Sequence, residues 1–386
     1  MKKKTKRIIK TTLLSFFSLI FLVILIAIFT LHGRIATMMS VRHVGNDLYT
    51  MNYQQNYHLD KALKAKIRDE EDLYKFFSKE MLFGHKVDNN IKKYGCSAFS
   101  AETPDGKKTT GRNFDLRGTS ALCVYTHPKG GYSSIGTVST DMVAVGGFKQ
   151  ASPKSFMGSA ALLVSPYICV DGMNEKGLCA ALLDMSAGET HMDTEKPDLI
   201  VTLAIRLLLD RAKNVDEAVN LLKKYDLQTA HGWTQHIYIS DRSGKSVIVE
   251  WVNDEMKLVD YNACTNFCMS DPALNGNYKA QCDRFDKLDS ALKESNIKTK
   301  EESMGLLIDV MQGFSTEWSV VFDQTDFTAD YAVDGYYDDV YHISPNSFAK
   351  TGLGLILIYL AFFLLVGGSI FLTYKLKKKK NNKTEE

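Results

Sequence analysis

This chain of 386 residues lacks the signatures of several common protein classes. No glycine-rich phosphate loop leads from a strand into a helix, and no stripe of basic and aromatic residues favours nucleic-acid binding. Cys264 and Cys268 have no second pair of ligands at zinc-site spacing. The sequence also shows no internal repeat. We therefore expect no bound metal or other cofactor, and no nucleic-acid partner.

The chain also has almost no net charge, because 47 basic residues balance 45 acidic ones. The basic residues nevertheless gather in the end segments 1–10 and 375–386, and each segment adjoins an uncharged apolar run. The runs 11–31 and 351–374 are long enough to cross about 30 Å of hydrocarbon as helices. No small-residue cleavage site follows the first run, which disfavours a secretory signal peptide. We expect two transmembrane helices that contact lipid of the cell membrane, with both basic tails in the cytoplasm and the intervening chain outside the cell.

Seven cysteines are scattered along the chain, and an odd number outside the cytoplasm leaves at least one thiol unpaired. Most of them are interpreted as small buried hydrophobic residues. The residues around Cys96, Gly95-Cys96-Ser97-Ala98, lack the signature of papain-like proteases. A reactive thiol is therefore expected, but in a different kind of enzyme.

The segment between the apolar runs divides into two parts. Residues 32–95 are polar, with helical patterns at 59–67 and 73–77, and are interpreted as a helical stalk or a pro-segment. Residues 96–347 combine strand and helix patterns, which predicts one layered α+β domain. A turn at Pro104-Asp105-Gly106 joins the first two strands, because proline fixes φ and glycine tolerates positive φ. Strands are expected at 96–102, 108–116, 121–126, 135–146, 161–170, 178–185, 236–240, 246–251 and 318–323, and helices at 199–211, 215–224, 284–293 and 303–312.

The segment from Cys96 to Asp115, which ends in Gly-Arg-Asn-Phe-Asp, resembles the opening of the choloylglycine hydrolase family of linear amide C–N hydrolases. This family includes bile salt hydrolases and penicillin V acylases; acid ceramidase and isopenicillin N acyltransferase are relatives. The resemblance implies a four-layer αββα sandwich of the N-terminal-nucleophile type over residues 96–347. Four further segments match in order, and a fifth resembles the closing strand: 171–178, 240–250, 265–266, 283–285 and 318–323.

Cys96 supplies the thiol nucleophile that amide cleavage needs. If Cys96 becomes the first residue of a mature chain, its α-amino group, with a pKa of about 8, can act as the base. While the Gly95–Cys96 peptide bond is intact, that nitrogen is an amide and cannot accept a proton. We therefore expect autocleavage at Gly95–Cys96, where glycine gives the thiol room and allows unusual φ. A buried cysteine at the start of a strand is the alternative.

The resemblance implies roles for four more residues. Arg112 would lie near the thiol of Cys96, and Asp115 would bind the α-amino group. These two positions are three apart, so their side chains point to opposite strand faces unless a bulge intervenes. Asn266 would stabilise the oxyanion, and Arg284 would support the surroundings of the nucleophile. The alternatives are an exposed ion pair, a turn asparagine and a solvated arginine at a helix start.

Asp184 departs from the family, in which an asparagine or tyrosine stands at this position. An ionised carboxylate only accepts hydrogen bonds and would repel an oxyanion. Asp184 is therefore protonated, contacts a basic group of the substrate, or is misaligned by one residue. The segment between Asn266 and Arg284 is also shorter than in bile salt hydrolases, so bile salts are not a safe guess for the substrate.

Together these features predict a membrane-anchored hydrolase that cleaves a linear, non-peptide amide of a small N-acyl molecule through an acyl-Cys96 intermediate. Transfer of the acyl group to an amine instead of water is one alternative. A membrane-tethered binding protein that has lost turnover is the other, and Asp184 is its main support. Association into a homo-oligomer is left open.

Overall fold

The computed structural model describes most of the chain outside its two ends. It covers residues 30–82, 84–85, 87–88, 95–118, 120–142, 144–145, 152–185, 192–229, 234–276 and 282–350, together with scattered residues in 16–26 and 359–370. Residues 1–349 form one compact unit, and residues 350–386 are assigned to a second. The first unit contains the whole candidate site.

Two large sheets form the centre of this unit. The six-stranded sheet has the order β16-β4-β5-β17-β18-β19, and the nine-stranded sheet has the order β1-β2-β6-β7-β9-β10-β13-β14-β15. The strands of the six-stranded sheet are β4 (Gly95–Glu102), β5 (Lys108–Asp115), β16 (Ala263–Cys264), β17 (Thr316–Asp323), β18 (Thr328–Val333) and β19 (Tyr336–Ile343). Those of the nine-stranded sheet are β1 (Arg42–Gly45), β2 (Leu48–Tyr53), β6 (Ala121–Thr126), β7 (Ser134–Ser139), β9 (Asp171–Asn174), β10 (Cys179–Met185), β13 (Thr234–Ser240), β14 (Ser246–Val252) and β15 (Glu255–Val259).

Helices cover the outer face of each sheet. They are α2 (Leu59–Lys64), α3 (Glu70–Glu80), α4 (Phe156–Ala161), α5 (Val201–Arg211), α6 (Val215–Leu222), α7 (Asp283–Glu294) and α8 (Lys300–Asp309). Short 3-10 helices are η1 (Thr140–Met142), η2 (Leu162–Tyr167), η3 (Pro272–Asn275), η5 (Gly313–Ser315) and η6 (Pro345–Ser347), and two small sheets pair β3 (Val87–Asp88) with β8 (Ala144–Val145) and β11 (Asp198–Ile200) with β12 (Asp226–Gln228). The helices α5 to α8 confirm the four helices expected between residues 199 and 312.

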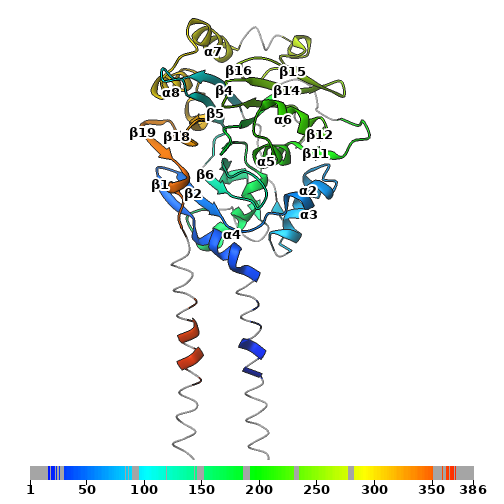
Figure 1. Ribbon diagram of the computed structural model, residues 1–386, viewed down its shortest axis with the longest axis vertical. Coiled ribbons are helices and arrows are strands. Elements are labelled where there is room, and N and C mark those ends of the chain that lie inside the picture. Colours follow the sequence, from blue (N-terminus) through cyan, green and yellow to red (C-terminus); the bar gives the residue numbers. More distant parts are fainter. Residues whose placement is uncertain are drawn as a thin grey trace, which may run out of the picture. The chain divides into compact units, whose positions relative to one another are not determined.

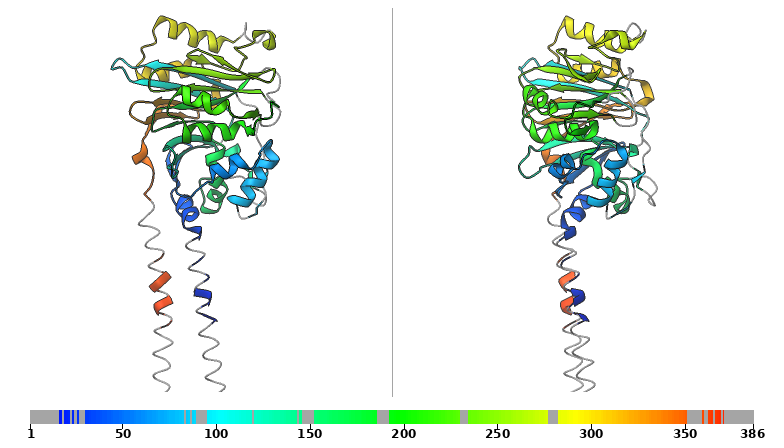
Figure 2. Two further views of the ribbon diagram at one scale, coloured as in Figure 1. Left: turned by 45° about the vertical axis from the view of Figure 1, so that its right-hand side comes forward. Right: turned by 90° about the vertical axis from the view of Figure 1, so that its right-hand side faces the viewer.

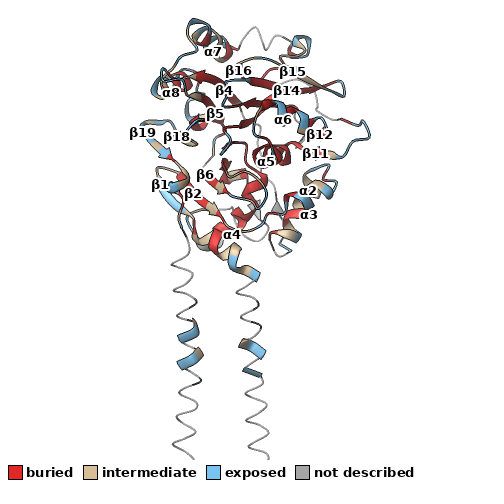
Figure 3. Ribbon diagram, viewed as in Figure 1, coloured by how far each residue is buried: buried red, intermediate tan, exposed pale blue. Residues whose placement is uncertain are grey.

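Three hydrophobic clusters separate four layers. One cluster joins α5 and α6 to the nine-stranded sheet, the second lies between the two sheets, and the third joins the six-stranded sheet to α7 and α8. Figures 1 and 2 show the strands stacked between these helices. The arrangement is the αββα order expected for this domain. In Figure 3 most strands of both sheets are buried, whereas the edge strands β1 and β19 are largely exposed.

The expected strand at 161–170 is wrong. The structure has the end of α4 there, followed by η2, which contains Pro166. All six residues of η2 are buried. A short apolar run that is buried on all sides shows the same pattern in a strand and in a buried helical turn, so periodicity alone does not separate the two.

The interpretation of residues 32–95 as a helical stalk is also wrong in part. Helices α2 and α3 are present, but β1 and β2 belong to the nine-stranded sheet, and β2 pairs in parallel with β6 from Leu48↔Ala121 to Tyr53↔Thr126. Twelve side chains between Tyr49 and Leu82 lie in the cluster that also contains α5. This segment therefore completes the folded domain.

The two predicted transmembrane runs, 11–31 and 351–374, and the basic tails beyond them lie mostly or wholly outside the described residues. Within the part of the chain that the structure describes, no helix has the length and apolar character needed to cross a bilayer.

Candidate active site

The site is built on the β4–β5 hairpin. The turn between these strands places Gly106 at a φ of 85°, as the Pro-Asp-Gly sequence predicts. The register then sets Gly95 opposite Asp115, Cys96 opposite Phe114, and Ala98 opposite Arg112. Cys96 is fully buried between the two sheets. The hairpin thus brings the thiol, Arg112 and Asp115 together.

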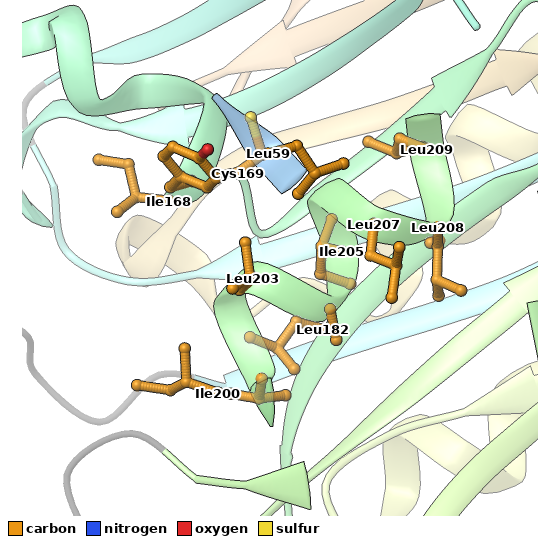
Figure 4. Close-up of a cluster of buried hydrophobic side chains, with 14 of the residues drawn as sticks. Leu59, Ile168, Cys169, Leu182, Ile200, Leu203, Ile205, Leu207, Leu208 and Leu209 are labelled. Carbon is orange, nitrogen blue, oxygen red and sulfur yellow. The ribbon is translucent and has the colours of Figure 1, made fainter. Parts of the chain in front are cut away.

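Arg112 crosses from the six-stranded to the nine-stranded sheet. Its Nε donates to Oδ2 of Asp171 over 2.8 Å, and its Nη2 donates to the carbonyl of Leu182 over 2.8 Å. The charged side chains of Arg112 and Asp171 are both fully buried. The Leu182 carbonyl is also 3.8 Å from Sγ of Cys96. Figure 4 shows the Leu182 side chain in the hydrophobic cluster with Leu203 and Ile205 of α5, so the strand that carries this carbonyl is held by packing from behind.

Asp115 faces the opposite side of β5, as the spacing from Arg112 predicts. Its carboxylate accepts hydrogen bonds from Nη1 of Arg284 at 3.1 Å, from Nε2 of Gln312 at 2.9 Å and from Oγ1 of Thr316 at 2.6 Å. Burial raises the pKa of the Asp115 carboxyl, and the Thr316 hydroxyl and the Arg284 guanidinium oppose that rise. Three donors therefore hold the carboxylate beside Gly95.

A bulge in β17 makes the contact with Thr316 possible. The register against β5 shifts between Thr316 and Trp318, so that Glu317 has no partner on the neighbouring strand. Trp318 points between the sheets, where its Nε1 donates to Asp171 over 3.0 Å. Without the extra residue, Thr316 would point the same way as Trp318. The bulge turns Thr316 toward Asp115.

Asn266 and Arg284 complete the surroundings of Cys96. Oδ1 of Asn266 accepts from the backbone nitrogen of Cys96 at 2.8 Å and from Nη2 of Arg284 at 2.8 Å. Nη1 of Arg284 also donates to the carbonyl of Cys96 over 2.9 Å. Arg284 therefore connects Asp115, Asn266 and the Cys96 backbone in one network.

Asp184 lies at the same site, on β10. Its carbonyl accepts from Nδ2 of Asn266 at 2.6 Å, and its carboxylate accepts from Nε2 of Gln235 at 3.1 Å. Asp184 is almost fully buried, and its charge contributes to raising the pKa of Cys96. The backbone of Asp184 therefore contacts Asn266 directly, whereas its carboxylate contacts Gln235 on the neighbouring strand.

Burial raises the pKa of the Cys96 thiol to about 12, although the Arg112 guanidinium opposes the shift. The thiol is therefore almost entirely protonated at neutral pH. In the uncut chain Cys96 is therefore a poor nucleophile until a base takes its proton. The nearest backbone nitrogen, its own, is still an amide.

Gly95 is the first residue of β4 and does not have the positive φ that the sequence suggested as one reason for glycine. Its role is to leave room. A Cβ at this position would overlap Nε2 of Gln312 and would lie 3.3 Å from Cβ of Asp115. Glycine thus lets Gln312 lie against the peptide bond before Cys96.

The sequence did not point to Asp171, Gln312 or Thr316 as parts of the site. Asp171 begins the matched segment Asp-Gly-Met-Asn, so a signal for it was present. Gln312 and Thr316 lie on either side of η5 and reach Asp115 through the fold alone. In the described parts of the chain, no group of three or more His, Cys, Asp or Glu side chains is arranged to hold a metal ion.

The profile of a family described as linear amide C–N hydrolases, choloylglycine hydrolase family, matches residues 96–298. A penicillin V acylase of Pectobacterium atrosepticum is 34% identical over 121 residues, which are 28% of this chain and 32% of that protein. A bile salt hydrolase/transferase of Clostridium perfringens is 26% identical over 177 residues, or 43% of this chain and 51% of that protein. The chain thus spans about a third to a half of the length of these relatives.

Two solved structures are similar over 65% of this chain. A mutant of the conjugated bile acid hydrolase from Clostridium perfringens has a TM-score of 0.49 and 18% identity, with 93% of that chain covered. The penicillin V acylase from Agrobacterium tumefaciens has a TM-score of 0.47 and 20% identity, with 86% covered.

Proposed function

Because this chain belongs to the choloylglycine hydrolase family, whose members hydrolyse linear amide C–N bonds, we propose that it cleaves the amide of a small N-acyl molecule through an acyl-Cys96 intermediate. The observation that carries this proposal is the 2.8 Å contact between the Cys96 nitrogen and Asn266. It places the atom that would become the catalytic amine against the side chain proposed to bind the oxyanion.

Activation requires cleavage of the Gly95–Cys96 bond. We propose that Sγ of Cys96 adds to the carbonyl carbon of Gly95 while the thiol proton passes to the Cys96 nitrogen, and that the C–N bond then breaks, which gives a thioester and a free amine. Water then hydrolyses the thioester and leaves Gly95 with a carboxylate. The Asp115 carboxylate lies beside the new amine, where it would hold the ammonium form and orient it.

Turnover follows the same chemistry on the substrate. The α-amine takes the thiol proton, Sγ adds to the substrate carbonyl, and the Asn266 amide donates to the oxyanion. Collapse expels the substrate amine, which receives the proton from the α-ammonium group. Water, activated by the same amine, releases the acid from Cys96. An acceptor amine in place of water would give acyl transfer.

The fragment that ends at Gly95 should stay bound after cleavage. Its strand β2 pairs with β6 over six residues, and Met51, Tyr53 and Phe77 are nearly fully buried in the core. Burying one such side chain contributes about 1.5–3 kcal/mol. Five or more of them account for as much free energy as the whole stability of a typical domain, about 5–15 kcal/mol. The mature enzyme is thus proposed to be a two-chain particle.

We also propose that runs 11–31 and 351–374 anchor the enzyme in the cell membrane with the catalytic domain outside. The apolar length of both runs and the lysines beyond them support this topology. Each product of cleavage would then keep one anchor. Protease added to intact cells should digest the domain and spare tags at both termini; digestion of either tag in intact cells contradicts the topology.

The proposed activity is tested on the full chain purified in detergent. N-terminal sequencing and intact mass should show two associated fragments, the second beginning at Cys96, and Cys96→Ala should remain one uncut, inactive chain. A panel of N-acyl amides should give free acid and amine, and added amines reveal any acyl transfer. An uncut wild-type chain that hydrolyses amides refutes the role of the α-amine. A cut chain that no N-acyl probe labels at Cys96 supports a binding protein instead.

A further inference from the structure

The segment that carries Asn266 has little regular structure of its own. It leaves the six-stranded sheet at β16, which pairs with β4 over only Ala263 and Cys264, and it reaches η3 at residue 272. Asn266 must nevertheless be placed to within a fraction of an ångström to donate to an oxyanion. Besides Cys96 and Arg284, which contact the Asn266 side chain, groups on the nine-stranded sheet hold the backbone of this segment.

His236 on β13 holds the segment just before Asn266. Its Nε2 lies 2.7 Å from the carbonyl of Thr265, and its Nδ1 lies 3.1 Å from Oε1 of Glu250 on the adjacent strand β14. Both partners are acceptors, so both ring nitrogens must carry hydrogen and the ring is an imidazolium. The pKa of His236 is raised well above its usual value: burial opposes the rise, and Cys264 and Glu250 outweigh it.

Glu250 holds the segment just after Asn266. Its Oε1 accepts from the backbone nitrogen of Met269 at 2.9 Å, and its Oε2 accepts from that of Ser270 at 2.7 Å. Burial would raise the pKa of this carboxyl, but His236 and these donors hold it at about 2. The side chains of His236 and Glu250 have no exposed surface. One buried ion pair therefore contacts the backbone on both sides of Asn266.

We propose that His236 and Glu250 are positioning residues that hold the Asn266 amide beside Cys96. Together with the carbonyl of Asp184, they form an anchor in which three neighbouring strands, β10, β13 and β14, each supply one group to the segment. The anchor fixes the position of the Asn266 amide relative to Cys96, which belongs to the six-stranded sheet. This inference rests on the proposed function, because it assigns to Asn266 the stabilisation of the oxyanion.

Two thiols also face the pair. Sγ of Cys264 lies 3.4 Å from Nε2 of His236, and Sγ of Cys268 lies 3.4 Å from Oε2 of Glu250. Because the pKa of His236 is raised, its charge stabilises the folded chain at low and neutral pH, and this stabilisation is lost as pH rises through the pKa in the folded chain. Because the pKa of Glu250 is lowered, its stabilisation of the fold is lost only as pH falls toward about 2. The anchor is therefore intact at weakly acidic and neutral pH.

The test compares Glu250→Gln and His236→Gln with a matched control in the full chain. The control is Asp210→Asn in the Arg206–Asp210 pair, which is equally buried and has a 2.7 Å contact, but lies within α5. Removing an oxyanion donor costs about 10²–10³ in kcat, so partial misplacement of Asn266 should lower kcat roughly 10- to 100-fold in both anchor variants. KM should change less than about threefold, since the interaction belongs to the transition state. Asp210→Asn should lower the melting temperature but leave the kcat of the folded enzyme within about threefold.

Two further measurements separate this inference from the proposed function. Alkylation of Cys96 by iodoacetamide forms no oxyanion, so its rate should stay nearly unchanged in Glu250→Gln. Amide hydrogen exchange of residues 264–275 should speed up at least tenfold in the anchor variants and not in Asp210→Asn. Wild-type kcat in folded anchor variants, or unchanged exchange in that segment, overturns the anchor and leaves the hydrolase intact. A wild-type chain without turnover defeats the proposed function, and then the exchange data alone decide whether the pair holds the segment.

Discussion

The Arg112–Asp171 pair allows a sharp test of how the site is supported. Asp171→Asn removes one charge from a pair in which neither side chain has exposed surface and the Nε–Oδ2 distance is 2.8 Å. The amide oxygen can still accept from Nε1 of Trp318 and from Arg112, but the guanidinium then lacks a counter-charge. Breaking a buried ion pair by removing one partner costs about 3–5 kcal/mol.

We expect a loss near the lower limit, about 3 kcal/mol, because asparagine keeps the acceptor. For a domain of this size, that loss lowers the melting temperature by roughly 6–12 °C. The measurement is thermal unfolding of the full chain in detergent at pH 7. Glu71→Gln serves as the control, since its ion pair with Lys75 on α3 is largely exposed and its loss should leave the melting temperature unchanged.

A double variant gives the decisive comparison. Arg112→Met combined with Asp171→Leu removes both charges together, so it should recover most of the stability lost in Asp171→Asn. A shift below about 2 °C in the single variant refutes the cost assigned to the unpaired arginine. A double variant as unstable as the single one shows that packing, not charge, fixes this part of the site.

Three other perturbations follow from the structure. Asn266→Ala should lower kcat by about 10²–10³ with little change in KM, measured by amide hydrolysis; an equal rise in KM would assign Asn266 to substrate binding. Gly95→Ala should push Gln312 from Asp115 and slow cleavage before Cys96, and Gln312→Ala should restore the rate in the double variant; cleavage at the wild-type rate in Gly95→Ala argues against the steric role. Burial raises the pKa of Glu317 well above its usual value, so the stability it contributes is present below pH about 4.5 and lost as pH rises through the folded pKa. The melting temperature of Glu317→Gln should therefore rise relative to that of the wild type between pH 5 and 8. If the two proteins show the same change of melting temperature with pH, the buried carboxyl is not neutral.

The residues of the candidate site were predictable where the local sequence decides the structure. The Pro104-Asp105-Gly106 turn fixes the β4–β5 hairpin, and the hairpin register alone puts Arg112 and Asp115 near Cys96. Asn266 and Arg284 were placed by resemblance, and the structure brings both to the backbone of Cys96: Asn266 accepts from its nitrogen, and Arg284 donates to its carbonyl. The positions of α6 and α7 followed from periodicity, because each of these helices buries apolar residues at spacings of three and four.

Contacts between distant segments were not predictable from such patterns. The parallel pairing of β2 with β6 joins residues more than seventy positions apart, and no local signal specifies it. The bulge at Glu317 decides that Thr316 meets Asp115, yet the alternating pattern of β17 continues regularly after it. His236 and Glu250 appear in the sequence as ordinary polar residues in two strands. Their proposed role depends on their contacts with residues 265–270, which are distant in the sequence.

The architecture also explains why a cut before the nucleophile need not damage the domain. β4 lies between β16 and β5, and Cys96, which would become the new N-terminus, pairs with Phe114 of β5, so it is held within its own sheet. The preceding segment is held separately, through β2, in the nine-stranded sheet. Breaking one peptide bond between two independently anchored strands releases neither of them. The proposed change would be chemical: an amide nitrogen beside Asn266 would become an amine able to take the thiol proton, while the groups around it stay in place.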